Sequence, residues 1–457
     1  MQPRMALNLK MPPPAAIVIV FAIVFLSALT ATAGVSMSSN ADDDRVFSVR
    51  CRLEVAGDLQ TAAPDSKGVT LPLKVDGRLS FLERRLPAGG KDAEAFRAAR
   101  SYQVGEARIE VSGQPNENHL PANGRLIVAE GRSNGVRLWS PSQPLTFDTL
   151  DLLSTPGDSL ALHALLPDRD VETGDTWEPA YWVLPLLTGV EAVSKHELTC
   201  KLEKIDEKFA VIAVSGSVEG AIDGAFTKIA VTGQVAWSLK GKHIRQAKIE
   251  QKEERTVGVV SPGMKVTATM YVDRQPSSLD GPLSGNRVDT IAIVPEPEQL
   301  ALQFSSPWDF HFECDRNWHL FHQTEDVAVL RLVEKGSLIA QCNVSKVPQV
   351  AAGSHTPEQT FQGDVQTALA GQLQQIVKAE QLETTDGRWL YRVTGTGMSN
   401  GRPMTWYYYL CAAPDGRQVA FAFSLETRFV EQFANRDLGF ARSLTFGSRS
   451  TSTAARR

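Results

Sequence analysis

The chain has 457 residues, of which 42% are apolar and 22% are charged, and its formal net charge is −5. A chain of this length typically folds as two or three domains, and these fractions are those of an ordinary folded protein. The small negative charge comes with no basic stripe, which argues against nucleic acid as a partner. Frequent alternation of β-branched residues, together with 34 Gly and 25 Pro, indicates a strand-rich chain.

The first distinctive stretch is the apolar run Ala15–Leu29, which follows two basic residues and precedes Ala31-Thr32-Ala33. A charged flank, an apolar core and an A-x-A site are typical of an export signal, so residues 1–33 are predicted to be a cleaved signal peptide. An uncleaved anchor over residues 15–37 is the alternative, because that stretch carries no charge. Either way we expect export to the periplasm, the cell surface or the extracellular space, with membrane contact only through an uncleaved leader.

Residues 34–44 are predicted to form a polar tether and residues 45–273 a first domain. Period-2 alternation predicts strands at 45–55, 69–81, 102–111, 125–129, 198–205, 210–218, 227–237, 244–257 and 264–272. Asp76-Gly77 is expected to turn a hairpin within the second of these runs. Short helices are predicted at 92–100, 145–153 and 158–166, the last capped by Asp158 or Ser159. Long antiparallel strands with a few short helices favour a large curved sheet that resembles a half-barrel.

Two segments of this domain, LTFDTLDLLSTPGDSLALHALLPDRDVETGDTW and EERTVGVVSPGMKVTATMYVDR, carry a resemblance to known sequences. They resemble a block found in uncharacterised exported proteins of planctomycete-type bacteria, over most of residues 45–273. That resemblance implies no activity. More loosely, the domain is similar to the curved half-barrels of lipoprotein carriers that hold acyl chains, although long curved sheets serve many purposes.

Residues 274–300 are predicted to be a linker, because Pro, Ser and Gly dominate and Pro295-Glu296-Pro297 is expected to forbid regular structure. A second domain follows at 301–446, and residues 447–457 are expected to be a disordered tail. Strands are predicted at 310–314, 318–322, 327–332, 338–345, 389–397, 403–410 and 418–425. A long helix is expected to begin at the cap Thr356 and to carry an apolar stripe from Phe361 to Val377. A closing helical section is predicted at 429–444.

This order of elements, together with the segments SSPWDFHF, MTWYYYLCAAPDGRQVAFAFSLE and FANRDLGFARSLTF, resembles the Mog1/PsbP-like fold over residues 301–446. The resemblance implies an α/β/α sandwich with a binding or accessory role, and it supplies no catalytic residues. The predicted fold class of the whole chain is therefore α+β, with a curved antiparallel sheet followed by a Mog1/PsbP-like domain.

The five cysteines are Cys51, Cys200, Cys314, Cys342 and Cys411, and their spacing matches no zinc or redox motif. Outside the cytoplasm disulfides are permitted, so a Cys51–Cys200 bond is the pairing to test first. The alternative is that all five are buried small apolar residues.

Three groups of residues are candidate catalytic or metal-binding sites. Ser399 lies in a G-x-S-x-G match, but the strand predicted after it favours a hairpin loop over a nucleophile elbow. His196 and Cys200 imitate part of a zinc helix, yet they fall in a predicted strand. His311, His319 and His322 are the densest set of metal-ligand types, and a strand would point them to different faces. No cofactor or metal is expected.

An aromatic run, Trp406-Tyr407-Tyr408-Tyr409, is the candidate lining of a ligand groove. The sequence therefore favours an exported, non-catalytic binding or accessory protein of the bacterial cell envelope, with a lipid or an envelope protein as its ligand. An envelope hydrolase that uses Ser399 or the cluster of His311, His319 and His322 is the alternative, and a structural surface protein is the third hypothesis. A large apolar concavity in the first domain would favour the binding protein, and a cleft joining Ser399 to a histidine and an acid would favour the hydrolase.

Overall fold

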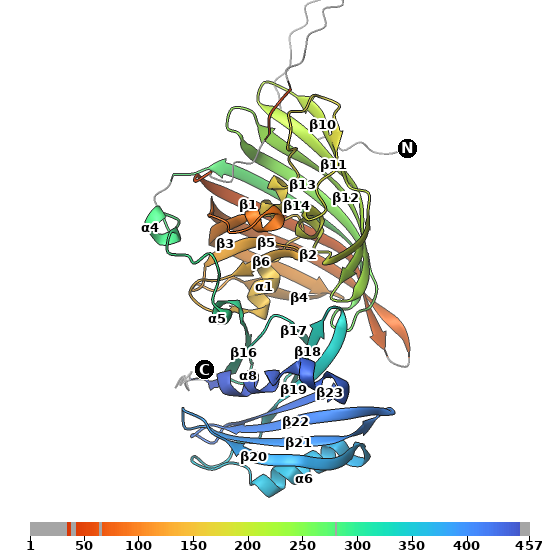
Figure 1. The fold of residues 1–457 in the computed structure, drawn as a ribbon, viewed down its shortest axis with the longest axis vertical. Helices are drawn as coiled ribbons and strands as arrows, with labels where there is room; N and C mark the ends of the chain where they lie inside the picture. The colour runs from red at the N-terminus through yellow and green to blue at the C-terminus, as the bar shows by residue number, and fades with distance from the viewer. Residues whose placement is uncertain (1–33, 38–42, 64–65, 279–280, 448–457) are drawn as a thin grey trace, which may run out of the picture.

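The computed structural model describes residues 34–37, 43–63, 66–278 and 281–447. The predicted leader and its cleavage site lie outside the described residues. None of the helices within these ranges has the length and apolarity that crossing a bilayer requires. Figure 1 shows a tall curved sheet followed by a smaller sheet with helices on both of its sides, which confirms the strand-rich α+β class.

The first part of the chain forms an antiparallel sheet of thirteen described strands. They are β1 (Val46–Ala63), β2 (Ser66–Arg85), β3 (Arg97–Val111), β4 (Gln114–His119), β5 (Leu126–Arg132), β6 (Gly135–Trp139), β8 (Thr176–Trp177), β9 (Ala192–His196), β10 (Thr199–Ile205), β11 (Phe209–Ile222), β12 (Ala225–Ser238), β13 (His243–Arg255) and β14 (Gly263–Pro276). Their order is β6-β5-β3-β2-β1-β14-β13-β12-β11-β10-β8, with β4 beside β3 and β9 beside β11. Burial alternates along these strands, most regularly in β12, because successive side chains point to opposite faces.

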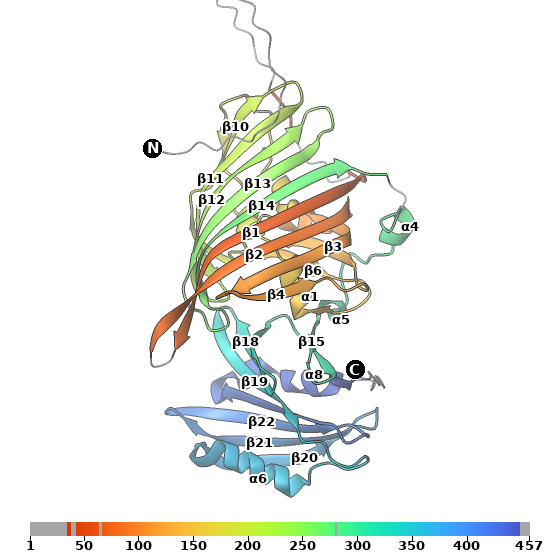
Figure 2. The same ribbon diagram turned by 180° about the vertical axis from the view of Figure 1, so that it is seen from behind.

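Short helices lie on the inner face of this sheet and account for its curvature. They are the 3₁₀ turn η1 (Asp92–Ala95) and the helices α1 (Phe147–Leu153), α2 (Ser159–His163) and α3 (Val183–Thr188). Helix α2 contacts both β5 and β13, which stand five places apart in the strand order, and α3 contacts both β6 and β9. The sheet must therefore curl around the helices, as Figures 1 and 2 show from its two sides. The concave face is thus filled by helices over part of its area.

One predicted turn is wrong. Asp76 and Gly77 lie in the middle of β2, opposite Glu54 and Leu53 of β1, and the chain reverses beyond Ala63 instead. Gly77 also pairs with Ala107 of β3, so it is bound on both sides by neighbouring strands. Long-range pairing on two sides outweighs the local preference of an Asp-Gly dipeptide for a turn.

A buried ion cluster fastens α2 to the sheet. The Arg100 guanidinium donates to Glu83 at 3.0 Å and to both oxygens of Asp158 at 2.8 and 2.5 Å, and all three side chains are at most 6% exposed. Ser159 donates to Glu83 at 2.7 Å, and Asp158 also caps α2 by accepting from the backbone N–H of Leu160. Burial favours the neutral acid, but Arg100 and its neighbours outweigh that effect and hold the pKa of Glu83 below its usual value.

The linker is more ordered than its composition predicts. It contains α4 (Gly285–Val288) and α5 (Pro297–Leu300), and α5 begins at the second proline of Pro-Glu-Pro. Proline suits the first helical position, where its missing N–H has no partner to lose, and Glu296 completes a capping box. Prolines here start a helical turn and do not prevent one.

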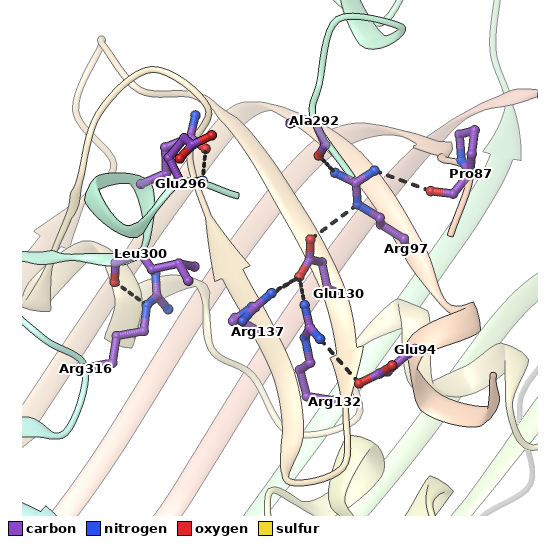
Figure 3. A network of polar contacts seen from close by, with 11 residues as sticks. Pro87, Glu94, Arg97, Glu130, Arg132, Arg137, Ala292, Glu296, Leu300 and Arg316 are labelled. Carbon is purple, nitrogen blue, oxygen red and sulfur yellow. Dashed lines mark hydrogen bonds and ion pairs between the residues drawn. The ribbon is translucent and has the colours of Figure 1, made fainter. Parts of the chain in front are cut away.

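Polar contacts tie the linker to the first sheet (Figure 3). Arg97 donates to the carbonyl of Ala292, and it forms an ion pair of 3.3 Å with Glu130. Arg316 donates to the carbonyl of Leu300 at 2.7 Å. An apolar cluster that joins Leu283, Val288 and Ile291 of the linker to Val46, Leu86, Ala99, Val128 and Trp139 lies beside these contacts. The linker is therefore packed against the first sheet.

A small sheet connects the two parts of the chain. Its strands are β7 (Leu145–Thr146), β15 (Leu302–Ser305), β16 (Phe310–Cys314) and β24 (Thr445–Phe446). β7 comes from the first part and pairs in parallel with β15 of the second. The two parts also meet at two hairpin tips, one carrying Gly224 and the other Gly336. They lie so close that a Cβ on Gly224 would be 2.5 Å from the Gly336 carbonyl oxygen.

The second part is a seven-stranded antiparallel sheet, in the order β17-β18-β19-β23-β22-β21-β20, between two layers of helix. Its strands are β17 (Trp318–Gln323), β18 (Val327–Glu334), β19 (Ser337–Val347), β20 (Leu373–Leu382), β21 (Trp389–Ser399), β22 (Arg402–Ala412) and β23 (Gln418–Glu426). Its helices are α6 (Glu358–Leu369), α7 (Val430–Phe433) and α8 (Arg436–Ser443), with short 3₁₀ turns η2 (Ala370–Gln372) and η3 (Thr427–Phe429). Buried Phe361 and Val365 on α6 and buried Phe440 on α8 pack against opposite faces of the sheet.

The long helix predicted here is too long. α6 ends at Leu369, and the rest of its expected stripe, Leu373 to Val377, belongs to β20. Ala370 has a positive φ of 46°, which no helix continues through. Thr356 is not the cap either, because its N–H donates to the side chain of Gln418 and the N-cap is Pro357.

The predicted disulfide is also wrong, since all five cysteines are free thiols. Cys51 lies on β1 and Cys200 on β10, and four strands stand between these two in the sheet. At about 4.8 Å per strand they are roughly 24 Å apart along the sheet, whereas a disulfide needs Cα atoms within about 7 Å. Four of the thiols are buried, and Cys51 is half-buried.

We expect Arg100→Met to destabilise the protein by roughly 3–5 kcal/mol, because it leaves two buried carboxylates without their cation. Equilibrium unfolding in urea at pH 7 measures this change. The matched control is Arg52→Met, since Arg52 is 53% exposed and its ion pairs lie in solvent. That control should alter stability by less than about 1 kcal/mol, and equal losses in both variants would contradict the role given to the buried cluster.

Candidate functional site

Ser399 lies at the end of β21, directly before the turn Asn400-Gly401. Both turn residues have positive φ, 49° and 74°, which suits a tight hairpin, and β22 follows at once. Ser399 borders an open groove together with Arg402 and Glu426, which form an ion pair with each other. None of the described residues that line the groove is a histidine, and its one carboxylate, Glu426, is paired with Arg402.

The histidine cluster is spread over two strands. His311 lies on β16, and His319 and His322 lie on β17. His319 stands 3.7 Å from Asp223, a residue of the β11–β12 hairpin tip. Within the described ranges, no three His, Cys, Asp or Glu side chains are placed to hold a metal ion. His196 and Cys200 are therefore not part of such a group either.

The aromatic run of β22 does not form one surface. Trp406 and Tyr408 pack with the residues of α6, whereas Tyr409 and Tyr407 face the other layer of helices. Tyr409 is 0% exposed and donates to Asp437 of α8, and the Tyr407 ring stacks on Phe433. Alternation along the strand divides the run between two cores, so the residues serve packing on both faces.

An apolar pocket lies where the helices do not fill the concave face of the first sheet. Its lining comes from four adjacent strands, β14, β1, β2 and β3, from β4, and from α1 with the residues after it. Cys51, Leu53, Leu79, Ala107 and Met270 form its apolar wall. The empty space measures about 530 Å³ with the open mouth included, and the space available to the centres of water molecules is about 100 Å³. The pocket is more apolar than the groove at Ser399.

The register of the strands explains why space remains there. Leu53 pairs with Met270 on one side and with Gly77 on the other, and Gly77 pairs in turn with Ala107. These residues share one face, and two small residues stand side by side in the row. A Cβ added at Gly77 would meet the Leu53 and Ala107 side chains at ordinary distances of 3.5 and 4.0 Å. The absent side-chain volume at these positions is therefore what opens the pocket.

Polar side chains lie at the rim, where Asn118 donates to the carbonyl of Asp148 at 2.9 Å. Arg78 and Glu106 alternate with Gly77 and Ala107 along β2 and β3, so their side chains point to the convex face, where they stand 3.8 Å apart. Asp151, on α1, is exposed at the mouth of the pocket, with protein around its other sides. Burial, with repulsion from Asp148 and Asp223, raises the pKa of Asp151 to about 6. Burial also raises the pKa of the Cys51 thiol, so that thiol is protonated and unreactive at neutral pH.

The sequence did not reveal this pocket. Its key residues, Gly77 and Ala107, become neighbours only through the pairing of β2 with β3. Asp151 gave no signal either, because with Asp148 it forms the exposed face of α1, whose buried residues are Thr149, Leu152 and Leu153.

Fold and pocket together define a strand-rich α+β protein with an apolar cavity on the inner face of a curved sheet. No family model and no curated protein matches the chain, so the expected likeness to exported planctomycete-type proteins finds no support. Among solved structures, the chain is similar to the cyanobacterial PsbP of Synechocystis sp. PCC 6803, at 16% identity and a TM-score of 0.25, over 32% of this chain and 92% of that one.

The chain is also similar to lipovitellin, from a structure describing its lipid–protein interactions. That match has 11% identity and a TM-score of 0.29, and it covers 53% of this chain and 26% of lipovitellin. At these identities and scores the two likenesses are at most likenesses of fold, and neither identifies what this chain does.

We expect Asp151→Asn to stabilise the protein more at pH 8 than at pH 4. The unfolded carboxyl titrates near 3.8 and the folded one near 6, so the folded state binds the proton more tightly. Stability therefore falls as pH rises from about 4 to about 6, and the amide removes that loss. Melting temperatures at both pH values measure the effect. Asp168→Asn, at an exposed site, controls for losing one carboxylate, and equal gains at pH 4 and pH 8 would refute the assignment.

Proposed function

We propose that this protein is an exported binding protein of the cell envelope that holds a narrow apolar group, such as one acyl chain, in the pocket between α1 and β1–β3. The observation that carries the proposal is the apolar wall of Cys51, Leu53, Leu79, Ala107 and Met270, left open on an otherwise filled concave face. Exposed apolar surface costs free energy in water, at roughly 25 cal/mol per Å², and a bound apolar ligand recovers that cost.

The size of the pocket limits the ligand. The volume available to the centres of water molecules is about 100 Å³. It is somewhat smaller than the roughly 150 Å³ of a dry cavity that binds benzene. Such a space takes the end of a chain or a small ring and leaves the rest of a longer ligand in the mouth. The ligand is therefore elongated, with one apolar end inside and its remainder at the rim.

The rim favours a ligand with a polar head, because Asn118 offers an amide there. Asp151 disfavours an anionic group beside α1 once its own carboxyl is ionised, because like charges repel. A neutral head therefore fits this rim better than a free carboxylate placed next to Asp151.

Export is part of the proposal and rests on the apolar leader with its A-x-A site. The hydrolase hypothesis has less support, since the groove at Ser399 has no lining histidine among the described residues and His311, His319 and His322 are dispersed. A structural surface protein has no need of an open apolar pocket, so the binding hypothesis accounts for more of the molecule.

We expect Ala107→Leu to weaken binding of decan-1-ol, which has one apolar end and a neutral head, at least tenfold, because three added carbons occupy the pocket. Isothermal titration calorimetry of the purified mature protein measures the affinity. Ala56→Leu is the matched control, since Ala56 is exposed on the opposite face of β1. Unchanged affinity in the Ala107 variant, with circular dichroism showing both variants folded, would overturn the proposal. Native mass spectrometry of the protein from its own host then identifies the natural ligand.

A further inference from the structure

A second, very different cavity lies near the end of β14, away from the apolar pocket. It is lined by Arg85, His163, Trp237, His243 and Arg274, with Asp43 and Lys242 at its edge. Arg274 is 2% exposed and Arg85 is 8% exposed, so both guanidinium groups are buried. Both arginines line the cavity, and the Nη1 atom of each is buried without a hydrogen-bond partner among the described residues. Buried donors of this kind are rarely left unpaired.

The charges around this cavity do not balance. Three guanidinium groups are buried here, on Arg85, Arg100 and Arg274, but only two carboxylates are buried with them, Glu83 and Asp158. Both carboxylates are engaged by Arg100, and Glu83 also stands 3.5 Å from Arg274. Asp43 at the edge is held by Arg45, through two contacts of 2.7 Å. Glu83 and Asp43 both act on the Arg85 cation, but each is shared with other arginines. The four guanidinium groups of Arg45, Arg85, Arg100 and Arg274 therefore outnumber the three carboxylates of Asp43, Glu83 and Asp158 by one.

Neither arginine can resolve the imbalance by losing its proton. Burial lowers the pKa of Arg274 to about 10, and it lowers that of Arg85 as well, so both are cations at neutral pH. Burial and nearby cations lower the pKa values of His163 and His243, so both imidazoles are neutral there. An uncompensated buried cation costs several kcal/mol, which a bound anion offsets.

The cavity admits a small ion. The space available to the centres of water molecules is about 10 Å³, which is close to what one water molecule occupies by the same measure. A phosphate, a sulfate or the carboxylate of a lipid exceeds this space, whereas a monatomic anion is close to the size of a water molecule. Trp237 supplies an apolar wall, and the Arg274 guanidinium carbon lies 3.3 Å from the centre of the Phe47 ring.

We propose that this cavity is a structural binding site for one halide ion, of chloride size, held by the Arg85 and Arg274 guanidinium groups. The ion completes the charge balance of the buried cluster that fastens α2 to the sheet. This site is separate from the apolar pocket and does not depend on the proposed function.

The test compares the melting temperature of the mature protein in sodium chloride and in sodium gluconate at equal ionic strength. We expect a saturable rise of a few degrees in chloride only, since an ion that binds only the folded state stabilises it by mass action. Arg85→Met should abolish the chloride response and melt no lower than the wild type in gluconate, because it removes the surplus buried charge and keeps an apolar side chain of similar reach. Arg108→Met, with an exposed guanidinium, is the matched control and should keep the response.

Crystals of the wild type soaked in sodium bromide provide a second measurement that needs no variant. An anomalous peak between Arg85 and Arg274 would support the halide site even if Arg85→Met fails to fold. Equal melting in chloride and gluconate together with no bromide peak would overturn the proposal, and the cavity would then hold water only.

Discussion

The first sheet depends on how one guanidinium is neutralised inside it. Arg100 projects from β3 into the concave face, where its charge is tolerable only beside Glu83 of the neighbouring strand and Asp158 at the start of α2. These contacts fix α2 against the inner face, and α2 in turn touches strands from both halves of the sheet. The position of α2 therefore helps to set the curvature of the sheet. It also determines which part of the concave face helices cover and where the apolar pocket stays open.

The two cavities of the first sheet differ because their walls differ in side-chain size and in charge. At the apolar pocket, small residues leave volume that nothing polar can use. At the arginine cavity, large cationic side chains leave almost no volume but an excess of charge. The first is suited to a ligand held by exclusion of water, and the second to an ion held by electrostatics.

Local sequence patterns predicted where the strands lie in the chain better than they predicted which strands lie side by side. Alternation identified the strands of both sheets because burial on one face imposes a period of two. It failed at Asp76-Gly77 and at the boundary of α6, where pairing partners distant in sequence, or one backbone torsion at Ala370, decide the outcome. The pocket and the cysteine pairing required the strand order itself, which places Gly77 beside Ala107 and separates Cys51 from Cys200, and no local pattern contains that order.

The parallel pair of β7 and β15 has a mechanical consequence. Thr146 pairs with Gln303 of the second part of the chain, and the same threonine caps α1, the helix that covers the apolar pocket. Helix α1 also contacts β15 directly. The strand that joins the two parts of the chain therefore runs directly into the helix that covers the pocket, so that helix cannot move far without disturbing the β7–β15 pair.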